Sequence, residues 1–93
     1  MVYAFVEMNV SNRDSFDDYR KLAGAALAKH GGAVLVFGKE SSVIEGHKTV
    51  PQIAAILSFP EAGAAQAWKK DPELQHVHDL RQNSGDVSIL LVG

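Results

Sequence analysis

A chain of 93 residues is long enough for one domain, which at this size buries only a thin hydrophobic core. Hydrophobic residues make up 46% of the chain and charged residues 22%, a composition typical of a folded globular domain and too apolar for a disordered one. The formal net charge is −2 and the nine basic residues are scattered, which argues against a nucleic-acid-binding protein.

The chain contains no cysteine, which excludes disulfides, thiolate metal sites and a cysteine nucleophile. This composition fits the reducing cytosol, so we expect a cytoplasmic protein. Residues 1–10 are apolar but are interrupted by Glu7 and lack a basic leader, so they do not resemble a signal peptide. No apolar run is long enough to span a membrane, and we expect no membrane partner.

The first half of the sequence predicts a strand, a helix and a second strand. Residues 2–9 are rich in β-branched and aromatic residues and predict a strand. Ser11, with Asp14 three residues later, resembles a capping box and is expected to open a helix. The helix is expected to end at Gly31 and Gly32. Its inner face at helical spacing consists of Phe16, Tyr19, Ala23, Ala26, Leu27 and His30.

The middle of the chain predicts two strands and a long connection between them. Residues 33–37 and 52–59 have the composition of strands. The connection between them is expected to contain a short extended segment at residues 43–45.

The last third predicts a helix that stops and restarts. Residues 61–70 form an alanine-rich helix, after which Asp71 is expected to cap a new start with Pro72 at its first position. The second segment is expected to run to about residue 83, and residues 87–92 predict the last strand.

The resulting βαββαβ order favours an α+β ferredoxin-like sandwich, a four-stranded antiparallel sheet with both helices on one face. Its strands look apolar on both faces, since Tyr3 and Phe5 alternate with Ala4 and Val6. Helices can cover only one face. The sequence therefore predicts a homodimer in which the second face packs against the sheet of another copy.

A set of residues spread along the chain carries a family resemblance: Gly31, Gly32, Glu45, Gly46, Phe59, Pro60, Ala67, Trp68, Pro72, Glu73 and Arg81. Together they resemble the DUF1330 family, which implies a dimeric α/β-barrel protein and no established activity. The spacing from Trp68 through Pro72 and Glu73 to Arg81 is the most specific part of this resemblance. The chain departs from the family pattern at Lys39, Lys70, Leu74 and His78.

Arg81 is the first candidate for a binding residue. If Leu74, Val77 and Leu80 form the inner stripe of the last helical segment, Arg81 lies close to that stripe. One interpretation is structural: the arginine reaches water along the stripe or pairs internally with Glu7 or Glu45. The other is functional, because a guanidinium fork suits an anion or a carboxylate ligand.

The histidines are weaker candidates. His76 and His78 are expected on opposite sides of the stripe, so they do not form a metal pair, and no zinc motif joins them to His30 or His47. We therefore expect no metal site. His78 could share a cleft with Arg81 as a general base or axial ligand, although a solvated histidine at the edge of the stripe is its default interpretation.

Other residues could line a ligand cavity between sheet and helices. Tyr19 shares the inner face of the first helix with His30, whose ring is expected to bond a carbonyl group near the helix end. Trp68 has the size and apolarity of a core residue but could also contact a ligand. The loop carrying Glu45 and His47 could close over such a cavity.

Two functional hypotheses follow from these residues. The first is a protein that binds a small organic or anionic ligand without turnover and has no cofactor. The second is an enzyme: Asn9, Trp68 and His78 resemble the Asn, Trp and His set of haem-degrading monooxygenases, which share the dimeric barrel and are related in fold to cofactor-free monooxygenases. That resemblance implies haem ligation by His78 and contact of Trp68 with the porphyrin. The sequence alone leaves both hypotheses open.

Overall fold

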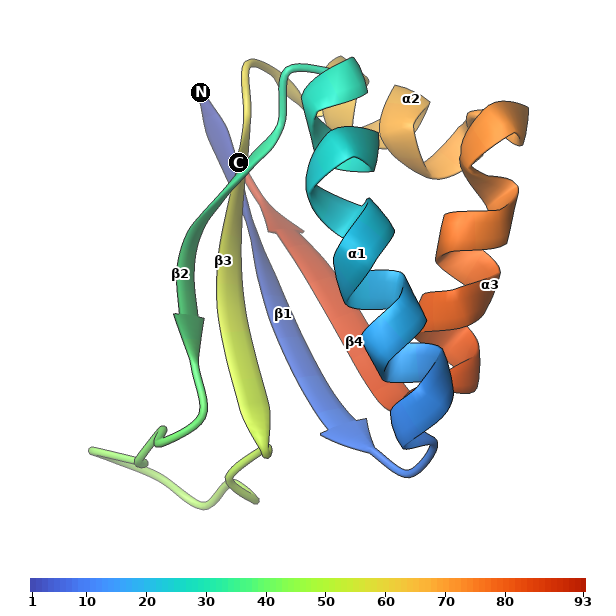
Figure 1. The fold of residues 1–93 in the computed structure, drawn as a ribbon. Coiled ribbons are helices and arrows are strands. Elements are labelled where there is room, and N and C mark those ends of the chain that lie inside the picture. Colours follow the sequence, from blue (N-terminus) through green and yellow to red (C-terminus); the bar gives the residue numbers. More distant parts are fainter.

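The computed structural model describes residues 1–93 and contains one sheet and one layer of helices (Figure 1). In chain order the elements are β1 (Val2–Val10), α1 (Arg13–Lys29), β2 (Ala33–Gly38), β3 (Ile53–Phe59), α2 (Ala62–Lys70), the 3₁₀ turn η1 (Pro72–Leu74), α3 (Gln75–Asn83) and β4 (Gly85–Val92). This order confirms the predicted one. The prediction of an extended segment at residues 43–45 is wrong, because the connection between β2 and β3 forms no strand.

The sheet has the strand order β2-β3-β1-β4, and every neighbouring pair is antiparallel. All three helices cover the same face (Figure 1). The predicted ferredoxin-like α+β class is thereby confirmed. The sheet is open, with β2 and β4 at its edges, so a single chain does not form a closed barrel. None of the helices combines the length and the apolarity needed to cross a bilayer.

The start of α1 differs from the prediction by one residue. Asn12, not Ser11, is the N-cap, and its side-chain oxygen accepts a hydrogen bond from the backbone N–H of Ser15 at 3.2 Å. The backbone N–H groups of Ser11 and Asn12 both donate to the carbonyl of Ser84, at 2.8 and 3.0 Å. The contact between the end of β1 and the start of β4 therefore fixes Ser11 outside the helix, and Asp14 completes no capping box with it.

The predicted helix restart at Asp71 is confirmed, and Asp71 has a second role. One carboxylate oxygen accepts from the backbone N–H of Glu73 at 2.9 Å. The other contacts Lys29 Nζ at 2.7 Å and His30 Nε2 at 2.8 Å. Hydrogen bonds from Lys29, His30 and the Glu73 backbone hold the pKa of Asp71 well below its usual value. The His30 ring thus bonds a carboxylate rather than the expected carbonyl group, and Asp71 ties the end of α1 to the break between α2 and α3.

The core lies between the helices and the side chains on one face of the two central strands. Its buried members come from β1, β3 and each of the helices and include Val6, Met8, Leu57, Phe59, Phe16, Leu27, Trp68 and Val77. Successive strand residues alternate between faces, so the residues between these core positions point to the other side of the sheet.

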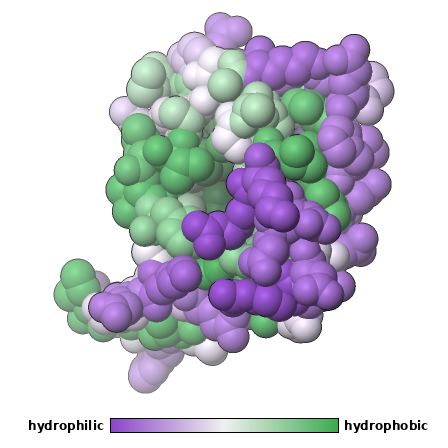
Figure 2. Space-filling model, in the orientation of Figure 1, coloured by the Kyte–Doolittle hydropathy of each residue, from purple (hydrophilic) through white to green (hydrophobic).

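That other side, the outer sheet face, carries an apolar row across all four strands. Val36 pairs with Ile56, Ile56 with Phe5, and Phe5 with Leu90. Leu90 is 65% exposed, and hydrophobic side chains gather on the sheet side of the molecule whereas hydrophilic ones cover the helices (Figure 2). An apolar surface of this kind marks an interaction site more often than a free surface.

Candidate functional site

A cavity of about 360 Å³ lies on the helix side of the sheet, between α2, α3 and the strands β1 and β4. This is where the sequence places a ligand cavity. Its walls are mostly apolar, and its lining residues are Ala4, Phe59, Ala65, Gln66, Trp68, Lys69, Arg81, Gln82, Val87, Ile89 and Leu91. We refer to it as the Arg81 cavity.

The guanidinium group of Arg81 is buried in this cavity wall without a counter-charge. The residue is 2% exposed, and its Nη1 atom has no hydrogen-bond partner. Its Cζ atom lies 5.0 Å from the centroid of the Trp68 ring and 5.8 Å from that of Tyr19. Aromatic faces attract a cation but do not replace a carboxylate partner. The positive charge therefore has no anionic partner within the protein.

Both structural interpretations of Arg81 are wrong. A side chain that is 2% exposed does not reach water. Glu7 alternates with the core residues of β1, so it points to the outer sheet face, where its carboxylate contacts Lys48 Nζ at 2.6 Å. Glu45 is exposed in the connection between β2 and β3, which projects from the end of the sheet opposite α2 (Figure 1). Neither carboxylate pairs with Arg81.

His78 is buried completely, so its interpretation as a solvated histidine is wrong. Its Nε2–H donates to the backbone carbonyl of Trp68 at 2.9 Å, and its ring meets the Trp68 indole edge-on at 4.8 Å between centroids. Trp68 lies in the last turn of α2, where carbonyl groups lack partners within the helix. His78 thus satisfies the end of α2 and stands behind Trp68, outside the wall of the Arg81 cavity.

The rotation of α3 explains this difference. The buried stripe of this segment consists of Leu74, Val77, His78, Arg81 and Ser84, whereas Leu80 is only half-buried. The predicted stripe included Leu80 because this residue is apolar, and it therefore faced a different direction from the observed stripe. The residues of the buried stripe follow one another at intervals of three, one, three and three positions, which is a helical spacing. The stripe could therefore have been predicted from spacing alone, without requiring its members to be apolar.

Three buried polar atoms without partners lie in this group of residues. They are Trp68 Nε1, His78 Nδ1 and Arg81 Nη1. Because the Trp68 carbonyl can only accept, His78 Nε2 carries the proton and Nδ1 is an acceptor in the neutral ring. Buried polar groups are rarely left without partners, so three of them in one group of residues set this part of the core apart.

The other predicted site residues lie elsewhere. Tyr19 lines a neighbouring cavity and contacts Arg81 from there, and His30 is held by Asp71. Asn9 is at the end of β1, where its side-chain oxygen accepts from the backbone N–H of Gln52 at 2.9 Å. It alternates with the core residue Met8 and so belongs to the outer sheet face. The structure therefore does not bring Asn9 together with Trp68 and His78 as the haem resemblance implies.

Three polar residues of the cavity were not among the predicted site residues. Gln66 and Lys69 lie on α2 next to Trp68, and Gln82 follows Arg81 on α3. Gln66 and Lys69 are three residues apart, so they lie on one face of the helix, and their spacing in the sequence could have indicated that they lie close together. His47 and His76 are exposed, and no group of three or more histidine, aspartate or glutamate side chains is arranged to hold a metal ion.

The environment of His78 predicts a pH dependence of stability. Burial, and next the positive charge of Arg81, lower the pKa of His78 from its ordinary value of 6.5. Below about pH 6.5 the unfolded chain then binds this proton while the folded chain does not, so acidification favours unfolding. We expect the free energy of unfolding, measured with urea, to fall less steeply between pH 7 and 5 in His78→Gln than in wild type. The two slopes should differ by at most about 1.4 kcal/mol per pH unit. His76→Gln, at an exposed site, should retain the wild-type dependence, and equal pH profiles for wild type and His78→Gln would contradict this account.

Comparisons with known proteins agree with the fold. Three solved structures illustrate this, and their low identities mean that the likeness concerns the fold alone. RPA0582 from Rhodopseudomonas palustris, a protein of unknown function, gives a TM-score of 0.77 at 16% identity, over 98% of this chain and 79% of that one. The methylated RPA0582 protein gives 0.79 at 14% identity, over 98% and 78% of the two chains. A dimeric ferredoxin-like protein of unknown function from Jannaschia sp. CCS1 gives 0.72 at 13% identity, over 99% and 97%.

These likenesses define the protein as a ferredoxin-like α+β protein. More particularly, it belongs to the DUF1330 family, a domain of unknown function whose family model matches residues 1–93. The family resemblance carried by Trp68, Pro72, Glu73 and Arg81 is thereby confirmed. No curated protein matches the sequence.

Proposed function

We propose that this protein binds a small organic anion, a carboxylate with an apolar body, in the Arg81 cavity. The observation that carries this proposal is the buried guanidinium of Arg81, which has no anionic partner in the protein. The absence of cysteine supports a cytoplasmic location for this binding protein.

The charge of the ligand follows from Arg81. Moving a cation out of water into an apolar environment is costly unless an opposite charge or hydrogen bonds compensate it. A carboxylate can accept two parallel N–H bonds from the guanidinium fork, which gives direction as well as affinity. The Trp68 ring, 5.0 Å from Cζ, holds the fork in place before the ligand arrives. The site therefore favours carboxylates over neutral molecules of the same shape.

The apolar body of the ligand follows from the walls. Phe59, Val87, Ile89 and Leu91 contribute hydrophobic surface, and the volume of about 360 Å³ falls within the range of small-molecule sites. Polar side chains in the lining besides Arg81 are Gln66, Lys69 and Gln82, all exposed on the helices. A ligand with one carboxylate and a compact hydrocarbon body fits this arrangement.

Benzoate tests this proposal, with neutral benzamide as its matched shape control. Trp68, the only tryptophan of the chain, contacts Arg81 and lines the cavity, so its fluorescence can report binding. Wild type should bind benzoate at least tenfold more tightly than benzamide. Arg81→Met should abolish that preference, because it removes the buried charge but keeps a side chain of similar length.

Lys69→Met is the matched control variant. Lys69 also lines the cavity, but it is exposed, so water already solvates its charge. Its replacement should change benzoate binding by less than about threefold. Equal affinity of wild type for benzoate and benzamide, or unchanged benzoate binding by Arg81→Met, would refute the proposal.

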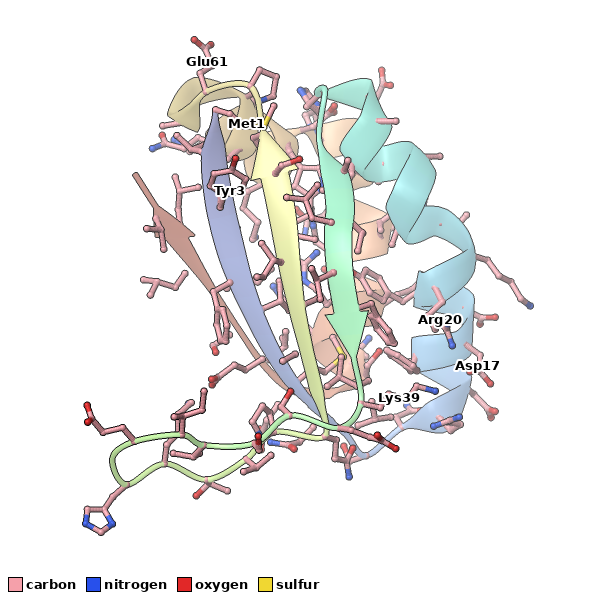
Figure 3. All side chains as sticks on the ribbon, turned by 90° about the vertical axis from the view of Figure 1, so that its left-hand side faces the viewer. Met1, Tyr3, Asp17, Arg20, Lys39 and Glu61 are labelled. Atoms are coloured by element: carbon pink, nitrogen blue, oxygen red, sulfur yellow. The ribbon has the colours of Figure 1, made fainter.

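We also propose that the protein forms a homodimer through the outer sheet face. The apolar row from Val36 to Leu90 is uncovered, and Tyr3 pairs with Val92 in a second row beside it. Figure 3 shows Tyr3 on this face of β1. A structural neighbour with the same fold is described as dimeric, which supports a second copy as the occupant. Because the Arg81 cavity lies on the opposite face, each protomer would contain its own complete ligand site.

A further inference from the structure

We propose a second ligand site, independent of the first, in the cavity between α1 and the β2–β3 side of the sheet. Its ligand would be an unbranched hydrocarbon chain with one anionic end group, the chemistry of a medium-chain fatty acid. The cavity has a volume of about 320 Å³, and 11 of its 13 lining residues are hydrophobic. The remaining two are Gly24 and Arg20, so a single charged side chain is present to select the polar end of a ligand.

The packing around this second cavity is incomplete. Val34 pairs with Leu57 and Phe37 with Ala55, so both point to the helix side of the sheet. They are nevertheless 48% and 43% exposed. A Cβ atom added at Gly24 on α1 would meet no atom within 4 Å. Gly24 is exposed as well, so this space is open to water, and an apolar chain lying in it would remove hydrophobic surface from water.

Arg20 determines the end group. Its Cζ atom lies 5.7 Å from the ring centroid of Phe16 on α1 and 5.4 Å from that of Phe37 on β2, so it stands between the helix and the edge strand. Figure 3 shows Arg20 on α1 near this edge of the sheet. Arg20 is exposed, so water solvates its charge in the ligand-free protein, and no carboxylate of the protein forms an ion pair with it, in contrast to Arg13, which pairs with Asp17. An anionic end group complements this free cation.

Tyr19 separates the two cavities. Its ring lines the second cavity and contacts Arg81, whereas Arg81 itself is not part of the second cavity wall. The two sites therefore differ in their cation and in their shape. This separation allows variants of one site to serve as controls for the other.

Calorimetric titration with hexanoate, octanoate and decanoate tests the proposal. Affinity should rise about fourfold for each added methylene as long as the chain remains inside the cavity. Gly24→Leu should weaken decanoate binding at least tenfold, because the new side chain fills the open space while the helix loses a glycine. Gly24→Ala improves the helix in the same way but leaves most of the space, and it should bind decanoate within threefold of wild type.

Arg20→Met should reduce the preference for decanoate over decanol without weakening decanol binding. Unchanged decanoate affinity in Gly24→Leu would overturn the proposal. So would loss of binding in Arg81→Met with retention in Gly24→Leu, which would place the acids in the Arg81 cavity. Loss of binding only in Leu90→Glu would place them on the outer sheet face and would equally overturn it.

Discussion

Arg81→Met should raise the free energy of unfolding of the ligand-free protein by about 1–3 kcal/mol. The substitution removes a buried charge that has no counter-charge. It also removes the Nη1 atom, which has no hydrogen-bond partner in the wild-type protein. Methionine keeps an unbranched, flexible side chain of similar length, so the contacts with Trp68 and Tyr19 are largely preserved. Urea unfolding of wild type and variant, without added ligand, measures the difference.

The opposing contribution is the attraction between the guanidinium and the two aromatic rings, which reaches about 2 kcal/mol in desolvated sites. We expect the desolvation cost to exceed it, since that cost amounts to several kcal/mol per buried ion. Lys21→Met removes an exposed charge from α1 and should change stability by no more than about 0.5 kcal/mol. A loss of stability in Arg81→Met would show that the protein itself compensates this charge.

Added benzoate should raise the stability of wild type relative to that of Arg81→Met. At a concentration one hundred times its dissociation constant, a ligand of the folded state stabilises by about 2.7 kcal/mol. This gain should appear in wild type and not in Arg81→Met. Stability and binding would then change in opposite directions on the same substitution, as expected of a residue retained for its ligand.

Leu90→Glu should convert the proposed homodimer into a monomer. Leu90 ends the apolar row of the outer sheet face and pairs with Phe5 on the neighbouring strand. In a sheet-to-sheet dimer each copy would bury one new carboxylate without a partner, and we expect the dimer dissociation constant to rise at least about a hundredfold. Sedimentation equilibrium measures this constant, and circular dichroism should show an unchanged fold because Leu90 is exposed in the single chain.

His76→Glu is the matched control for this substitution. It introduces the same side chain at an exposed position of α3, on the side of the molecule away from the outer sheet face. The association of this variant should equal that of wild type. A wild-type chain that stays monomeric at high concentration, or a Leu90→Glu variant that still dimerises, would rule out the proposed interface.

The features that the sequence predicted well depend on local interactions. Asp71 caps the helix restart through a backbone group two residues away, and Gly31 takes the positive φ of 74° that ends α1. The four-stranded antiparallel sheet follows from the order of strands and helices along the chain. Such features can be predicted because the groups that decide them are close in sequence.

The errors come from contacts between distant segments. Ser11 fails as a cap because its backbone N–H reaches the carbonyl of Ser84 at the other end of the chain. His78 is buried on the inner stripe of α3, and the partner that its ring finds there is the carbonyl group of Trp68, ten residues earlier in the chain. The predicted pairing of Arg81 with Glu7 failed for another reason. Glu7 alternates with the core residues Val6 and Met8, so the sequence pattern already indicated that Glu7 lies on the outer sheet face, away from Arg81.

The contacts of Asp71 also have a mechanical consequence. The helices α2 and α3, which cover the Arg81 cavity, meet at this residue, and both of its basic partners come from the end of α1. Any separation of α2 from α3 at this corner would stretch these short contacts. The corner between the two helices that cover the cavity is therefore held by the end of α1, so a change in the position of α1 would be transmitted to the cavity cover.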